Sequence, residues 1–152
     1  MSKTKTAIAL PGSPAEIAGA EWKDVEGWYA ELAAAPLTPE TRDAWLEAWS
    51  RLEEVLTEAA SRAMIAYTLD TADKAKEAVH LRFSTDIMPK ADERSVGLAR
   101  RLLASGLSRP DLETTLRRFR TASEIFREEN VPLFSELEEL GSRYQRITGA
   151  MT

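Results

Sequence analysis

Apolar residues along this chain recur at intervals of three and four positions, the spacing of helices that bury one face. The longest such stripe consists of Trp45, Trp49, Leu52, Leu56, Ala59, Ala63 and Tyr67. Thr38, Pro39 and Glu40 precede it and form a helix start signal, because Thr38 offers a capping oxygen and Pro39 has the φ of a first turn. We therefore predict one long helix that begins at this signal and ends near Leu69.

Other segments repeat the same spacing on either side of this helix. Asp24 is expected to cap a helix that ends near Ala35, with the inward residues Trp28, Tyr29 and Leu32. Thr71 is expected to cap a third helix, whose inward residues are Ala75, Ala78, Val79, Phe83 and Ile87. Pro89 should interrupt that helix, since proline cannot donate the next hydrogen bond.

A fourth helix is predicted from about Asp92 to Gly106, a natural left-handed cap, with the inward residues Val96, Ala99, Leu102 and Leu103. Helix restarts after Pro110, with the inward residues Leu112, Leu116, Phe119, Ile125 and Phe126. A last segment after Asn130 carries the apolar face Leu133, Leu137, Leu140, Tyr144 and Ile147. Six helical segments with short connections predict an all-α fold, an antiparallel array of about six helices.

The last two segments are separated by Asn130, Val131 and Pro132. Pro132 disfavours helical geometry at Val131, and Asn130 tolerates the left-handed conformation. We predict a kink here that re-aims the last helix, and a functional hinge is the alternative interpretation. Because the apolar face continues to Ile147, close to Thr152, we expect this helix to lead into a further part of the protein.

Length and composition describe about one domain, with residues 1–20 as an extended or mobile lead-in and residues 21–152 as the helical domain. No run of about 18 apolar residues occurs, so no membrane span is predicted, and Ala7–Leu10 is too short for a secretory signal. The absence of cysteine fits a cytoplasmic protein. The net charge of −5 disfavours a dedicated nucleic-acid-binding protein.

Several local patterns occur together in a characteristic order. They are Pro36-Leu37-Thr38, Trp45-Leu46, Trp49-Ser50, Tyr67–Asp73, Phe83 with Ile87-Met88-Pro89, Glu124–Leu133 and Tyr144–Met151. In order and spacing, the chain from Trp22 onward resembles the N-terminal helical region of oligoendopeptidase F-like enzymes. These enzymes belong to the thimet oligopeptidase family of zinc metallopeptidases.

The resemblance implies an all-helical, two-lobed enzyme that hydrolyses short peptides in a deep channel with a zinc-activated water. It also implies a His-Glu-x-x-His helix, whose histidines bind zinc and whose glutamate is the general base. This chain lacks that motif, so we assign it no catalytic, cofactor-binding or metal-binding residue. We interpret it as the non-catalytic N-terminal part of such an enzyme, truncated before the catalytic domain, and expect it to be inactive alone.

The partners expected from the resemblance are the catalytic lobe of the same polypeptide, which would hold the zinc, and short peptide substrates. Neither a nucleic acid nor a membrane is expected as a partner. The alternative interpretation is a stand-alone helical protein-interaction module without enzymatic activity, which binds a partner helix through an exposed apolar face.

Single residues with reactive or charged side chains have ordinary structural interpretations. His80 is the only histidine, so we interpret it as a helix residue, with a peptide or inter-lobe contact as the alternative. The adjacent carboxylates Glu53-Glu54, Glu128-Glu129 and Glu138-Glu139 point about 100° apart on a helix, which favours solvated faces over a catalytic pair.

The stretch from Arg94 to Arg120 is basic, with seven arginines and the acids Asp111 and Glu113. We favour pairing with acids of adjacent helices or of the absent lobe over a nucleic-acid surface, because base-stacking aromatic residues are nearly absent. Trp45 and Trp49 are interpreted as core.

Overall fold

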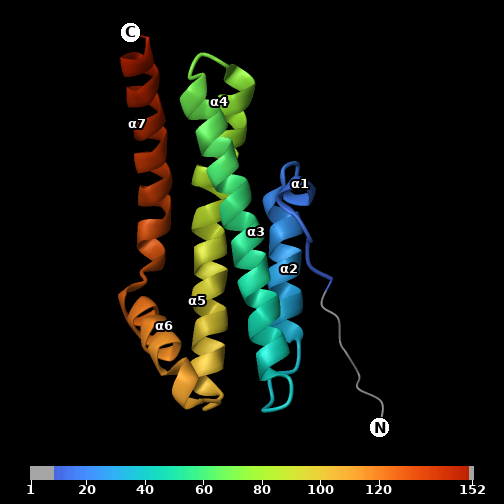
Figure 1. The fold of residues 1–152 in the computed structure, drawn as a ribbon. Helices are drawn as coiled ribbons and strands as arrows, with labels where there is room; N and C mark the ends of the chain where they lie inside the picture. Colours follow the sequence, from blue (N-terminus) through green and yellow to red (C-terminus); the bar gives the residue numbers. More distant parts are fainter. Residues whose placement is uncertain (1–8, 151–152) are drawn as a thin grey trace.

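The computed structural model describes residues 9–150, and the regular structure of these residues is entirely helical. The elements are α1 (Pro14–Ile17), α2 (Trp22–Ala34), α3 (Arg42–Leu69), α4 (Lys74–Leu81), the π-helical segment η1 (Arg82–Ile87), α5 (Met88–Ala104), the 3₁₀ turn η2 (Pro110–Leu112), α6 (Glu113–Ile125), the 3₁₀ turn η3 (Glu128–Asn130) and α7 (Val131–Gly149). In Figure 1, α2, α3, α5 and α7 run roughly alongside one another, and α6 crosses near one end. The predicted all-α class is confirmed.

The hydrophobic core is built from α1, α2, α3, η1 and α5, with α3 contributing the most residues. Every residue of the predicted α3 stripe is buried, including Trp45 and Trp49. Trp45 also donates its indole N–H to the carbonyl of Leu32 at 2.8 Å, and Arg101 donates to the same carbonyl at 3.0 Å. That carbonyl needs outside donors because the residue four positions later is Pro36, which has no N–H.

Two helices begin at residues other than those predicted. α2 begins before Asp24, because Glu21 is the cap and Asp24 completes a reciprocal capping box with it. α3 begins at Arg42, one turn later than the signal at Thr38 suggested. The reason is a local turn in which the Thr41 hydroxyl accepts the Thr38 N–H at 2.9 Å.

The start and the inner face of α4 also differ from the prediction. Its cap is Asp73 instead of Thr71, because the Asp73 carboxylate accepts hydrogen bonds from two backbone N–H groups at once. Glu77 and His80 face inward, because both find polar or aromatic partners on α3 and α7. The alanines and the valine predicted to face inward are exposed, and they are Ala75, Ala78 and Val79.

The predicted interruption at Pro89 is wrong, because helix continues from α4 through η1 into α5. Proline cannot donate to the carbonyl four residues earlier, which belongs to Thr85. The chain shifts to the wider π-helical spacing over η1, just before Pro89. The Thr85 carbonyl accepts the Ser135 hydroxyl at 2.8 Å, so α7 supplies a bond that proline withholds.

The lead-in predicted for residues 1–20 lies partly outside the described residues, which begin at residue 9. From residue 14 the structure differs from an extended lead-in, because the chain forms α1. Ile17 is fully buried and Ala20 nearly so, and α1 contacts α3. Burial of Ile17 explains the difference, since it gives this segment a share of the core.

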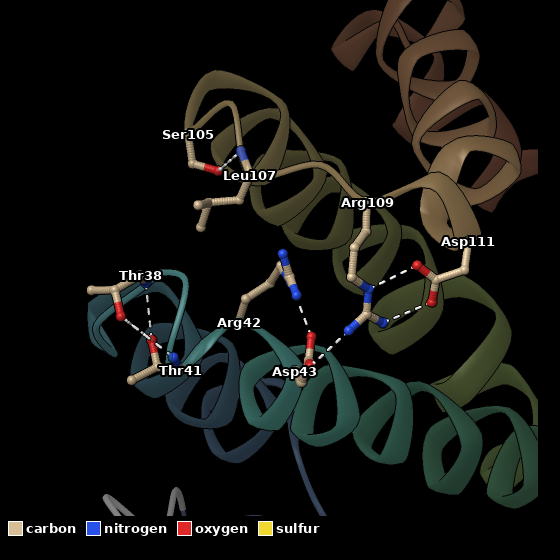
Figure 2. A network of polar contacts seen from close by, with 8 residues as sticks. All are labelled: Thr38, Thr41, Arg42, Asp43, Ser105, Leu107, Arg109 and Asp111. Carbon is tan, nitrogen blue, oxygen red and sulfur yellow. Dashed lines mark hydrogen bonds and ion pairs between the residues drawn. The ribbon is translucent and has the colours of Figure 1, made fainter.

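The turn between α5 and α6 contains a left-handed glycine and is held to α3 by an arginine. Gly106 has the predicted left-handed conformation, with a φ of 68°. Beyond it, the Arg109 guanidinium bonds Asp43 of α3 at 2.9 Å and Asp111 of η2 at 2.8 Å (Figure 2). A hydrogen bond from Arg42 holds the pKa of Asp43 below its usual range, and Arg109 adds to this effect. These charge-assisted bonds fix η2 against the first turn of α3.

The break between α6 and α7 lies earlier than predicted. Phe126 and Arg127 have extended backbone, whereas Asn130 and Val131 are in the right-handed helical region. Pro132 lies in the first turn of α7, where a backbone N–H is not needed. The proline therefore starts the last helix instead of bending it.

Candidate interaction surfaces

α7 contacts the rest of the molecule through its polar side. The Tyr67 hydroxyl donates to the carbonyl of Ser142 at 3.1 Å, and Arg146 pairs with Glu77 at 3.1 Å. Together with Ser135, these α7 residues lie on one helix face. Ser142 is the one residue of α7 that is buried. The helix is therefore held on the bundle by hydrogen bonds and an ion pair, with little apolar contact.

The apolar side of α7 faces solvent, and we call it the outer stripe. Its members are Leu133, Leu137, Leu140, Tyr144 and Ile147, and each is 58–69 % exposed. They lie at alternating intervals of four and three residues, on the opposite side of the helix from Ser142. The apolar face predicted from the sequence exists, but in residues 9–150 no other element covers it.

A second surface, which we call the central groove, lies between α3 and the α6–α7 arm. Two adjoining cavities of about 450 and 760 Å³ form it, and both are lined by Asp92, Phe126 and Phe134. One end reaches Met64 of α3, and the other reaches Leu112 of η2. The η1 segment and α5 also line it. In the view of Figure 1, α5 lies between α3 and α7.

Glu53 is half-buried in the wall of the central groove, which corrects the solvated face predicted for it. Its Oε1 accepts the Tyr29 hydroxyl at 2.7 Å, the Trp49 indole N–H at 3.0 Å and the Ser95 hydroxyl. Burial raises the pKa of Tyr29, and the negative charge of Glu53 raises it further. The neighbouring Glu54 is exposed, as predicted.

Asp92 of α5 lies at the junction of the two cavities. Its carboxylate makes no hydrogen bond or ion pair with any residue in the range 9–150. Loss of hydration raises the pKa of Asp92, and the charge of Glu53 raises it further. The basic residues next to it in sequence are engaged elsewhere, because Lys90 pairs with an acid of η1 and Arg94 with an acid of α2.

The end of the central groove near Met64 combines aromatic and polar groups. His80 is buried in α4, and its ring stacks on Tyr67 with ring centroids 5.1 Å apart. The Ser84 hydroxyl of η1 is buried without a hydrogen-bond partner among the described residues. His80 is thus a packed helix residue that also lines the cavity, with Ser84 nearby in the same lining.

The arginines of the basic stretch from Arg94 to Arg120 differ in their partners: some pair with acids, some donate to backbone carbonyls, and some do neither. Arg94 and Arg109 pair with acids of α2 and α3, which confirms the predicted pairing between helices. Arg101 instead donates to backbone carbonyls at the end of α2. Arg100 likewise donates to a backbone carbonyl, that of Ser123 in α6. Arg117, Arg118 and Arg120 of α6 form neither an ion pair nor a side-chain hydrogen bond with another described residue.

α6 buries none of its residues, although several were predicted to face inward. Leu116 and Phe119 are partly buried against the core, and the Phe119 ring stacks on Trp49 at 4.8 Å. Ile125 is 70 % exposed, which contradicts its predicted position. The reason is that α6 contacts α5 along one side only and spans the end of the central groove.

Sequence reasoning did not identify the central groove. Glu53 and Asp92 are distant in sequence, and only the packing of α5 against α3 brings them to one cavity. A usable signal was present, because Glu53 follows the inward residue Leu52 and lies four positions after Trp49. That position places its carboxylate at the edge of the buried face.

No protein family, curated protein or solved structure was found to match the chain. Among the described residues, no three His, Asp or Glu side chains are grouped so that they could hold a metal ion. Within residues 9–150, none of the helices combines the length and the hydropathy that crossing a membrane requires.

Proposed function

We propose that this chain is the N-terminal, non-catalytic part of a zinc-dependent oligopeptidase, a metalloendopeptidase that hydrolyses short peptides. In this proposal it forms a wall of the substrate channel. The catalytic lobe of the same polypeptide supplies the zinc and the His-Glu-x-x-His helix. The ordered resemblance from Trp22 onward suggests this family, and the all-helical structure agrees with it.

The outer stripe is the observation that carries the proposal. Amphipathic helices normally turn their apolar face toward the body of the protein. α7 is oriented the other way, because its polar face contacts α3 and η1 and its leucines are exposed to solvent. Burial of apolar surface contributes about 25 cal/mol per Å². A further lobe that covers this stripe would therefore bury its apolar surface and gain binding free energy.

The most direct test is to read the coding sequence downstream of the codon for Thr152. The proposal expects an open reading frame that continues to a His-Glu-x-x-His motif on a predicted helix. A stop codon immediately after Thr152 would contradict it. This observation requires no folded protein and separates the proposal from its alternative.

A second test uses the purified chain and a quenched fluorescent peptide. We expect no hydrolysis and no tight zinc binding, because the groups that would activate water are assigned to the catalytic lobe. Zinc-dependent cleavage by a preparation freed of contaminating proteases would overturn the assignment.

The alternative is a stand-alone helical interaction module, and the same outer stripe favours it. Apolar positions spaced by four and three residues suit a partner helix. This alternative requires a genuine stop codon together with a folded chain that is monomeric until its partner is added. Sedimentation velocity of the chain alone measures that state.

A further inference from the structure

We infer that the central groove binds an amphipathic helix that carries a lysine or arginine in the middle of its apolar face. The groove lies on the inner side of the α6–α7 arm, whereas the outer stripe lies on the opposite side of α7. The inference therefore stands independently of the proposed peptidase function.

The walls of the groove determine which backbone can occupy it. They are helix surfaces, and their exposed lining is mainly apolar, with Met64, Phe126 and Phe134 among the contributors. An extended peptide would leave most of its own N–H and C=O groups without partners there. A helix satisfies these groups internally and presents only side chains. From Leu46 to Met64 the α3 wall is about 27 Å long, at about 1.5 Å per residue, which suits a helix of roughly 18 residues.

The charge in the groove determines what the helix carries. Glu53 and Asp92 contribute two carboxylates at the middle of an apolar surface, and Asp92 has no partner among residues 9–150. The nearby cations Lys90 and Arg94 are already paired with other acids. A lysine or arginine on the docked helix would face these carboxylates where water is partly excluded. In such surroundings charge pairs gain strength.

The position of the pair also fits a docked helix. Asp92 lines both cavities, so apolar surface extends from it in both directions along the groove. The expected partner therefore has apolar side chains one and two turns before and after its basic residue. This is the pattern by which helix-binding grooves recognise their targets.

The test uses a synthetic helix of about 18 residues with leucines at helical spacing and one central lysine on the leucine face. Matched peptides replace that lysine by glutamate or by leucine. Binding is measured by calorimetry on the whole chain, and amide shifts in NMR locate the peptide. We expect the lysine peptide to bind about tenfold or more tightly than the glutamate peptide. The shifts should centre on the groove faces of α3 and α5.

Variants of the chain complete the test. Asp92→Asn with Glu53→Gln should remove most of the preference for lysine, while circular dichroism confirms the fold. Ser61→Trp should block the groove, because Ser61 is exposed and lines it, and Arg62→Trp on the adjacent surface is the matched control. No binding, equal affinity for the lysine and glutamate peptides, or shifts confined to the outer stripe would each overturn the inference.

Discussion

Trp49 belongs to the hydrophobic core and also lines the central groove. It is 5 % exposed, and its ring contacts those of Trp45 and Phe119 at centroid distances of 5.4 and 4.8 Å. Trp49→Ala should lower the free energy of unfolding by about 3–5 kcal/mol, because it leaves a large cavity. We also expect loss of cooperative unfolding, measured by urea titration with circular dichroism.

Trp49→Phe is the matched control for this prediction. It keeps an aromatic ring but removes the indole N–H that donates to Glu53 and Ser95 at 3.0 Å. A hydrogen bond contributes about 1 kcal/mol, so this variant should lose much less stability than Trp49→Ala. An unchanged unfolding curve for Trp49→Ala would show that the tryptophan is not part of the core.

Asp92 should make the free energy of unfolding fall as the pH rises, which is the reverse of the usual effect of a carboxylate. Its pKa in the folded protein is raised by loss of hydration and by the charge of Glu53. In the unfolded chain an aspartate has a pKa of about 3.9. Between these two pKa values the folded state holds more protons than the unfolded state. Stability from this group is therefore present below the unfolded pKa and is lost as the pH rises through the folded pKa.

Asp92→Asn should remove this loss without changing the shape of the side chain. We expect the variant to be more stable than the parent at neutral pH and equal to it below the unfolded pKa. Urea midpoints of both proteins across this range measure the difference. A variant that is less stable at neutral pH would mean that Asp92 has a cationic partner in the folded chain.

The burial or backbone conformation of a residue could be predicted where the local sequence pattern alone determines it. Trp45 and Trp49 lie on an unbroken stripe, and the left-handed Gly106 follows the last periodic position of its helix. The partners of Glu53 and His80 could not be predicted, because they are hydrogen-bond or ring partners from other helices. Polar residues are accepted inside a protein when such partners exist, and a single sequence does not show them.

Among the elements, α7 departs most from the rule that helices bury their apolar face. Leu137→Glu and Leu140→Glu should change the stability of the chain by no more than about 0.5 kcal/mol, because both leucines are in water. Leu52→Ala, at a fully buried position, should cost about 2–5 kcal/mol and serves as the positive control. Thermal unfolding followed by circular dichroism compares the three variants. A large loss at Leu137 would place the stripe inside the folded chain.

Helices could be predicted more reliably than their ends. The α3 stripe and its end at Leu69 follow from spacing, but its start depends on a turn between Thr38 and Thr41. Pro89 was expected to break a helix, and it does not, because a π-helical segment and Ser135 compensate for the missing donor. Compensation of this kind is tertiary, so periodicity cannot reveal it.

The whole molecule divides into a core and an arm. Apart from Pro11, all buried apolar side chains of the described residues come from positions between Ile17 and Leu102, and α6 and α7 supply none. The hydrophobic pattern of α7 predicts a helix with one apolar face and says nothing of what covers that face. The arrangement of the arm could not be predicted for this reason, and neither could the groove that it encloses.

This division predicts two levels of stability within one chain. Hydrogen exchange measured at increasing urea should show that α3 and α5 amides exchange only when the whole protein unfolds. Amides of α6 and α7 should exchange through a smaller opening of lower free energy and weaker urea dependence, because few apolar contacts hold the arm. Tyr67→Phe removes the hydroxyl that bonds Ser142 and should lower the opening free energy of the arm by about 1 kcal/mol without affecting exchange in α5. Identical exchange free energies in all helices would show that core and arm unfold as one unit.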